Sequence, residues 1–262
     1  MMIFTTNIAY CYCVILINVS IAITSFGQTT GDRFIQTAKT HLGKSYEINT
    51  LDLQKEEVLT IDTTQFDCVT FVECVIAQTL CKKPFNYSSF EKNLTNLRYR
   101  NGNIDGYSSR LHYFSEWLLQ AEKNGIGKNI SLELGGELRK KQIHYMSTNE
   151  KKYPKLHDQG VFTKIRESEI ELSNAALAYI PNPKIDNVLA KLQNGDIIAM
   201  VSSVSGLDIS HTGFIIIKNQ NVHLLHASSR TKKVEITKQP LGQHLKTMPF
   251  IEGIIIFRYT IQ

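Results

Sequence analysis

The sequence predicts an α+β fold in which helices come first and a small antiparallel sheet comes last. After Cys68, apolar residues recur at three- and four-residue steps, which is the spacing of one helical face. The last third of the chain instead holds short apolar runs, most of them joined by short turns containing Gly, Asn or Lys. Short connections favour antiparallel pairing, and segregated helices and strands favour helices packed on one sheet.

Each expected element has its own signal. A first helix covers 32–42 and is closed by Gly43, and a second begins at Cys68 with Asp67 as its N-cap. Residues 51–60 are expected to form a short strand or a loop. Two further helices are expected on the repeats Phe90, Leu94, Leu97 and Leu111, Phe114, Ser115, Leu118, Leu119. The expected strands are 195–201, 211–217, 222–227, 234–237 and 253–259.

Length and composition fit one globular domain with an insertion. The chain has 262 residues, of which 42% are hydrophobic, enough to fill a substantial core. Residues from about 85 to 188 lack a strong strand pattern, so we expect a largely helical insertion there, with 125–183 as helices and loops over the candidate site. The formal net charge of +5 comes from scattered Lys and Arg, which argues against nucleic acid as a partner.

The first 27 residues look like a secretory signal peptide. They contain no charged side chain, and an apolar run over 13–23 precedes the sequence Ser25-Phe26-Gly27-Gln28. We expect cleavage after Gly27, which leaves 28–262 as the catalytic domain, exported to the periplasm or beyond the cell, with no stable membrane association. A retained N-terminal anchor is the alternative. Cleavage leaves three cysteines, and an odd count in an exported protein indicates a free thiol.

Cys68 is the candidate nucleophile. A thiol at the first turn of a helix feels unpaired backbone N–H groups and the positive end of the helix dipole, and both favour thiolate. The alternative is a small buried hydrophobe, the usual role of a lone cysteine and the role expected for Cys74 and Cys81. Those two lie seven residues apart on one helix, too far for a mutual disulfide.

His211 and His226 are the candidate partners of the thiol. His211 begins one expected strand and His226 ends the next, so antiparallel pairing through the turn at 218–221 makes the two rings neighbours. A thiol needs a base, and that base needs a third group to orient its ring. His223 competes for the third role, but it points to the opposite face of the strand from His226 and is expected to be exposed.

A zinc site is the rival chemistry. Asp208 with His211 and His226, or Cys68 with the two histidines, could supply ligands. The chain has no tight Cys-x-x-Cys or His-Glu-x-x-His spacing, and a helix N-terminus suits a nucleophile better. We therefore expect no metal and no other cofactor.

The run 107–113 offers candidate substrate-binding residues. In one interpretation Arg110 binds a carboxylate of the substrate, together with Ser109, His112 and Tyr113. In the other, the run is a solvated helix start with capping serines.

Five segments taken in order resemble the motifs of the NlpC-type cell-wall cysteine peptidases and amidases. They are Gly43-Lys44-Ser45-Tyr46, Phe66-Asp67-Cys68-Val69-Thr70-Phe71-Val72, Leu192-Gln193-Asn194-Gly195-Asp196, His211-Thr212-Gly213-Phe214 and Leu225-His226-Ala227-Ser228. Two departures are Val69-Thr70, where the family has Ser-Gly, and Ser45, where it has proline. These departures, with 70–73 and 109–113, are similar to the branch of exported N-acetylmuramoyl-L-alanine amidases long filed as a domain of unknown function.

The resemblance implies a papain-like core with the nucleophile helix packed on the sheet. It also implies hydrolysis of the amide between the lactyl group of N-acetylmuramic acid and L-alanine in peptidoglycan fragments (muropeptides), including anhydro-sugar ones. In that reaction we expect the Tyr46 hydroxyl and the backbone N–H of Cys68 to stabilise the oxyanion. A γ-D-glutamyl endopeptidase and a catalytically silent cell-wall binding module are the alternatives.

Overall fold

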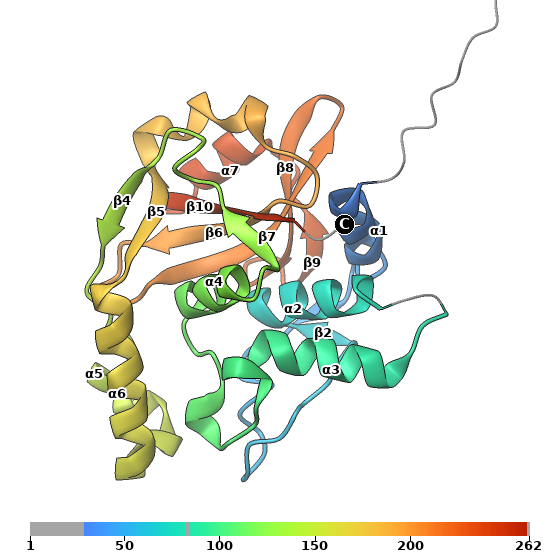
Figure 1. Cartoon of the computed structure of the whole chain (residues 1–262). Coiled ribbons are helices and arrows are strands. Elements are labelled where there is room, and N and C mark those ends of the chain that lie inside the picture. The colour runs from blue at the N-terminus through green and yellow to red at the C-terminus, as the bar shows by residue number, and fades with distance from the viewer. Residues whose placement is uncertain (1–28, 82–83, 261–262) are drawn as a thin grey trace, which may run out of the picture.

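The computed structural model describes residues 29–81 and 84–260, and the expected signal peptide lies outside this part. Among the described residues, ten strands form one sheet in the order β2-β1-β9-β8-β7-β6-β10-β5-β4, with β3 also paired to β10 (Figure 1). The β1–β2 pair is parallel, and the other pairs are antiparallel. The strands are β1 (Ser45–Tyr46), β2 (Gln65–Phe66), β3 (Gly127–Asn129), β4 (Glu137–Lys140), β5 (Ala176–Pro181), β6 (Ile197–Ser202), β7 (Ile209–Lys218), β8 (Asn221–Ser228), β9 (Lys233–Ile236) and β10 (Ile251–Tyr259).

Helices cover both faces of the sheet. They are α1 (Thr30–Lys39), α2 (Cys68–Thr79), α3 (Tyr87–Arg98), α4 (Phe114–Lys123), α5 (Tyr145–Thr148), α6 (Gln159–Asn174) and α7 (Leu241–Lys246). Short 3₁₀ helices occupy Arg100–Gly102, Tyr107–Ser109, Glu150–Lys152, Pro154–His157, Asn182–Asn187 and Leu189–Lys191. In Figure 1, α2, α3 and α4 lie on one side of the sheet and α7 on the other. No helix within the described ranges is both long and apolar enough to cross a bilayer.

Successive apolar side chains of the central strands point to opposite faces of the sheet and form two hydrophobic cores. Phe214 of β7 and Leu225 of β8 pack with α1 and α2 on one face, whereas Ile215 and Leu224 pack with α7 on the other. Because successive strand residues point to opposite faces, one apolar strand can serve both cores. A third, smaller core lies among α5, α6 and the segment before α4.

The start of α2 is fixed by an N-terminal cap. The Asp67 carboxylate accepts from the backbone N–H of Thr70 at 2.7 Å, and the Thr70 hydroxyl accepts from the backbone N–H of Asp67 at 2.9 Å. This confirms the predicted N-cap and the predicted helix start. Glu73 of α2 is 2% exposed and pairs with the buried Arg98 of α3 at 2.8 Å. The cap and the buried ion pair together hold Cys68 at a defined position.

The prediction of an α+β fold is confirmed, but the predicted small sheet is wrong. Strands β3, β4 and β5 come from the segment expected to hold only helices and loops, and they extend the sheet. The residues of β4 and the first half of β5, Glu-Leu-Arg-Lys and Ala-Leu-Ala, are helix formers, so their pairing along the sheet overrides their local preference. Helix α7 was not expected from the sequence.

Candidate active site

Cys68 opens α2 at a place where two central strands separate. The β7–β8 register runs only from Lys218 opposite Asn221 to Phe214 opposite Leu225, whereas β7 continues to Ile209. The backbone N–H of Thr212 lies in this separated part of β7. It hydrogen-bonds the Cys68 thiol and lowers its pKa, as do the N–H groups of Cys68 and Val69. The sulfur therefore lies beside the residue that follows His211.

The Cys68 thiol is protonated in the resting protein. Its pKa is raised to about 12, first by burial and then by the negative charge of Asp67, and the three backbone N–H groups oppose these effects only in part. The backbone N–H groups at the helix N-terminus do favour the thiolate, as expected, but the desolvation of the sulfur outweighs them, so the net shift in the free protein favours the thiol. A nucleophilic Cys68 therefore needs a base that removes its proton.

His211, the residue before the Thr212 that contacts Cys68, forms a buried imidazole pair with His226. Nε2 of His211 is 2.5 Å from Nδ1 of His226, and the ring centroids are 4.8 Å apart and nearly perpendicular. This confirms that the two rings are neighbours. Gly213 allows β7 and β8 to approach closely here, because a Cβ at that position would lie 2.8 Å from the carbonyl oxygen of Leu225 and 2.9 Å from the Cβ of His226. With a hydrogen on its Nε2, His211 keeps a free lone pair on Nδ1 to accept a proton.

Both imidazoles are neutral at neutral pH. Burial lowers the pKa of His211 to about 4, with a smaller contribution from the charge of His244. Burial also lowers the pKa of His226 to about 2, helped by the charges of His211, His244 and Arg230. A neutral His211 can act as a base, which is the state that a protonated thiol requires.

These shifts predict loss of stability in weak acid. Because both pKa values in the folded protein lie below the ordinary histidine value of about 6.5, the unfolded chain binds more protons below that pH. The stabilisation that comes from keeping the two rings neutral is fully present above pH ~6.5. It is lost as the pH falls toward the pKa values of the folded protein, by up to about 1.4 kcal/mol per pH unit for each ring. Thermal unfolding between pH 7.5 and 5 measures this loss. A His226→Asn variant should show a weaker dependence, and equal slopes in the two proteins would contradict the assignment.

Tyr46 lies at the edge of the same site. In the parallel β1–β2 pair it stands opposite Phe66, two residues before Cys68. Burial raises the pKa of the Tyr46 hydroxyl, and the negative charges of Cys68, once its thiol ionises, and of Asp67 add to the shift, so the phenol remains a hydrogen-bond donor at neutral pH. The ammonium group of Lys232 lies 5.4 Å from the ring centroid, within cation–π distance.

A cleft of about 210 Å³ opens on the imidazole pair. Its polar wall is formed by Ser210, His211, His226, Ser228, Ser229, Arg230, His244 and Thr247, and its apolar wall by Met248, Pro249, Phe250 and Ile251. Cys68 is not part of either wall. The cleft can therefore hold a part of a ligand that extends past His211.

Comparison with known proteins now identifies the family. The model of the N-acetylmuramoyl-L-alanine amidase-like (AmiA-like) family matches residues 36–254. The chain belongs to this family. No curated protein matches it.

Solved structures agree with the family. An N-acetylmuramoyl-L-alanine amidase from Bacteroides uniformis is 34% identical, with a TM-score of 0.84, over 88% of this chain and 99% of its own. A proposed xylanase from Bacteroides fragilis is also 34% identical, with a TM-score of 0.80, over 85% of this chain and 99% of its own. A protein from Legionella pneumophila shares the fold at 22% identity and a TM-score of 0.67, over 88% of this chain and 89% of its own. The resemblance inferred from the sequence is confirmed at the level of the amidase-like family.

In this amidase-like protein, the side chains of the predicted substrate-binding run form ion pairs and hydrogen bonds with other parts of the same chain. Arg110 is 5% exposed and forms ion pairs with Asp52 and, at 3.7 Å, with Glu57. The other members of the run also have internal partners: Ser109 donates to the carbonyl of Gly106, His112 bonds the carbonyl of Tyr107, and Tyr113 donates to Glu169. None of the four lines the cleft beside the imidazole pair. Their role in substrate binding stays a prediction.

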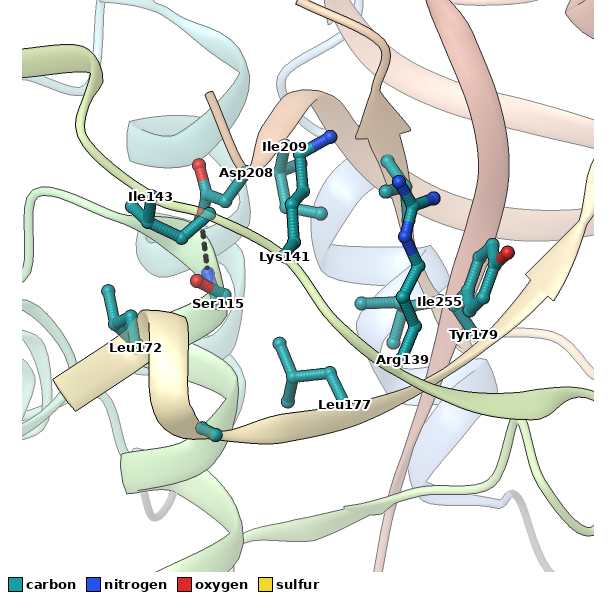
Figure 2. A pocket seen from close by; sticks show the side chains of 12 residues that line it. Ser115, Arg139, Lys141, Ile143, Leu172, Leu177, Tyr179, Asp208, Ile209 and Ile255 are labelled. Atoms are coloured by element: carbon teal, nitrogen blue, oxygen red, sulfur yellow. Dashed lines mark hydrogen bonds between the residues drawn. The ribbon is translucent and has the colours of Figure 1, made fainter. Parts of the chain in front are cut away.

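Asp208 lies close to His211 in sequence, but its side chain binds the start of α4. Figure 2 shows its carboxylate bonded to the backbone N–H of Ser115, at the start of α4, over 2.7 Å. The pocket around this bond measures about 40 Å³ and is bordered by isoleucine and leucine side chains, with Lys141 and Arg139 at its edge. Such a space is far smaller than a substrate pocket. Among residues 29–81 and 84–260, no group of three His, Cys, Asp or Glu could hold a metal ion.

Two further histidines differ from expectation. His223 was expected to be exposed but is buried, because its Nδ1 bonds the carbonyl of Thr237 at 2.9 Å beneath the end of β9. His244 of α7 was not considered from the sequence, yet its ring centroid lies 5.6 Å from that of His226. The helical spacing of Leu241, His244 and Leu245 is the signal that could have located it.

Proposed function

We propose that the protein is a cysteine-dependent amidohydrolase of peptidoglycan fragments. Its target is the amide between the lactyl group of N-acetylmuramic acid and L-alanine. The observation that supports this most is the position of the Cys68 thiol, which contacts the strand residue next to the buried His211–His226 pair. Membership of the amidase-like family supports the choice of bond. The motifs quoted above support a papain-like, NlpC-type relationship.

In the first step, His211 acts as the general base. Its Nδ1 takes the proton of Cys68 as the sulfur attacks the lactyl carbonyl carbon, and the carbonyl π electrons move to oxygen. The backbone N–H of Cys68 and the Tyr46 hydroxyl stabilise the resulting oxyanion. A buried thiol suits this order, because the proton leaves only when a bound substrate can accept the sulfur electrons.

In the second step, His211 returns the proton. It protonates the alanine nitrogen, and the C–N bond breaks. The peptide departs, and the acyl group remains on Cys68 as a thioester. Water then attacks the thioester carbonyl while His211 removes its proton, and Cys68 leaves as the protonated thiol. His226 orients the His211 ring throughout. No step needs a metal or another cofactor.

The location of the protein is part of the proposal. An uncharged, apolar N-terminal segment supports export to the periplasm or beyond the cell, where peptidoglycan is accessible. The three cysteines of the described part, Cys68, Cys74 and Cys81, are all free. We propose that residues 28–262 form one catalytic domain, with 85–188 as an insertion.

A glycosidase is less consistent with the site, although one similar structure is a proposed xylanase. Glycoside hydrolysis commonly uses two carboxyl groups on either side of the bond that breaks. The described residues that line the cleft include no Asp or Glu. A γ-D-glutamyl endopeptidase uses the same thiol chemistry and differs only in the bond presented to Cys68, so it is the alternative that an experiment must separate.

Mass spectrometry of the products from one defined muropeptide tests the proposal. We expect a muramic acid sugar with a free lactyl carboxylate and an intact peptide that begins with L-alanine. A peptide cut after its γ-D-glutamyl residue would identify the endopeptidase. Uncleaved substrate would favour a binding module. Parallel reactions on the anhydro-sugar form of the same muropeptide define which fragment is preferred.

A further inference from the structure

The His226 ring has a buried donor without an acceptor. Its Nε2 is shielded from solvent and has no hydrogen-bond partner among the described residues. When His211 acts as the base, its Nε2–H donates to Nδ1 of His226, so the hydrogen of His226 lies on Nε2. Buried donors rarely stay unpaired in native proteins, and such a group therefore indicates a missing acceptor.

A positive charge without a partner borders the same cleft. Arg230 is exposed, lines the cleft with His226 and His244, and forms none of the ion pairs within the described ranges. Its charge lowers the pKa of both His226 and His244, behind the larger effect of burial, so its field acts inside the cleft. The serine hydroxyls at 228 and 229 add further donors on this wall.

We propose that this cleft binds a carboxylate of the stem peptide, with Arg230 as its counter-ion and the Nε2–H of His226 as its buried donor. The inference rests on the proposed amidase function and names the part of the substrate that is recognised. A guanidinium and an imidazole N–H form strong charge-assisted hydrogen bonds to a carboxylate. The apolar wall around Met248 and Phe250 suits the aliphatic part of the same ligand.

The bound carboxylate also acts on the catalytic pair. It accepts from His226, which fixes the tautomer of that ring and, through the short bond between the rings, the lone pair of His211. A carboxylate behind a catalytic imidazole serves this purpose in hydrolases with a Ser-His-Asp triad. Here the substrate supplies the group, so binding of the peptide prepares the base that activates Cys68.

Glu235 is the internal carboxylate that could compete for this role. It stands opposite His226 in the β8–β9 register. It makes no hydrogen bond to His226 and no ion pair with Arg230 among the described residues, and it lines the neighbouring hollow rather than this cleft. A substrate carboxylate is therefore favoured as the acceptor.

Two muropeptides that differ only in one stem-peptide carboxylate, free or converted to a carboxamide, test the proposal. For the wild type we expect kcat/KM to be about ten- to a hundredfold higher on the carboxylate form. Arg230→Gln should bring this ratio close to one. Lys92→Gln removes an equal charge from the outer side of α3 and should keep the wild-type ratio.

Other outcomes overturn the proposal. Equal rates of the wild type on the two substrates, or an unchanged ratio in Arg230→Gln, would show that no carboxylate is read in this cleft while leaving the amidase function intact. A Glu235→Gln variant that is slow on both substrates with an unchanged ratio would assign the acceptor to Glu235. Failure to cut the muramoyl–alanine bond in either substrate would instead remove the proposed function itself.

Discussion

Replacing Cys68 with alanine is expected to lower turnover by about 10⁴-fold or more while leaving the fold intact. The variant loses the atom that forms the thioester, and what remains is the stabilisation offered by the oxyanion donors and by substrate binding. Although the sulfur is buried, the residue as a whole is partly exposed and is not among the residues of the main core, so the thermal midpoint should change little. Initial rates on a defined muropeptide and a thermal unfolding curve measure the two effects.

Cys74→Ala is the matched control for this prediction. Cys74 lies on the same helix but is 3% exposed and belongs to the core, so its replacement should lower stability and retain turnover. The rates at which Cys68 and Cys74 are alkylated in the resting protein would distinguish the two thiols less clearly, because burial raises the pKa of both to about 12. Turnover by Cys68→Ala above about one per cent of the wild-type rate would contradict a cysteine mechanism.

Replacing His211 with alanine is the second large effect that we expect. Because the Cys68 thiol is protonated at rest, loss of the base should lower turnover by about 10⁴-fold, nearly as much as loss of the sulfur. The two residues act as a unit, so the double variant should be no slower than either single variant. Rates of the two single variants and of the double variant, measured on one substrate, test this.

His223→Ala is the control for the histidine prediction. His223 belongs to the strand next to His211 and is equally buried, but it bonds the carbonyl of Thr237 and does not line the cleft. Its replacement should destabilise the protein by about 1–3 kcal/mol, because a buried carbonyl loses its partner. Turnover should remain. A variant lacking His211 that keeps most of its activity, or strictly additive losses in the double variant, would exclude His211 as the base of Cys68.

Features with a local cause were predictable from the sequence. The cap that starts α2 needs only Asp67 and Thr70, three residues apart, and the His211–His226 contact follows from strand pairing around a short turn. Strands β6 to β10 were expected from short turns and apolar runs, whereas the pairing of β10 with β6, its partner far back in the sequence, was not. In each case the interacting groups are close in sequence or related by simple pairing, so pattern and spacing are sufficient.

Features with a tertiary cause were not predictable. The high pKa of Cys68 results from burial against the sheet, and burial cannot be read from a helix start. The partners that engage Arg110, which are Asp52 and Glu57, lie more than fifty residues away. Strands β4 and β5 are composed partly of helix formers and depend on their neighbours in the sheet. His244 reaches His226 only because α7 packs on the far face of the sheet.

The acyl group on Cys68 is the species that tests the mechanism most directly. Enzyme in excess is mixed with a defined muropeptide and quenched in acid at successive times, and the protein is digested for peptide mapping by mass spectrometry. We expect the peptide that contains Cys68 to gain transiently the mass of the muramoyl acyl group, as the L-alanyl peptide is released. Release of that peptide with Cys68 unmodified at every time, or with the acyl group on another residue, would contradict the account.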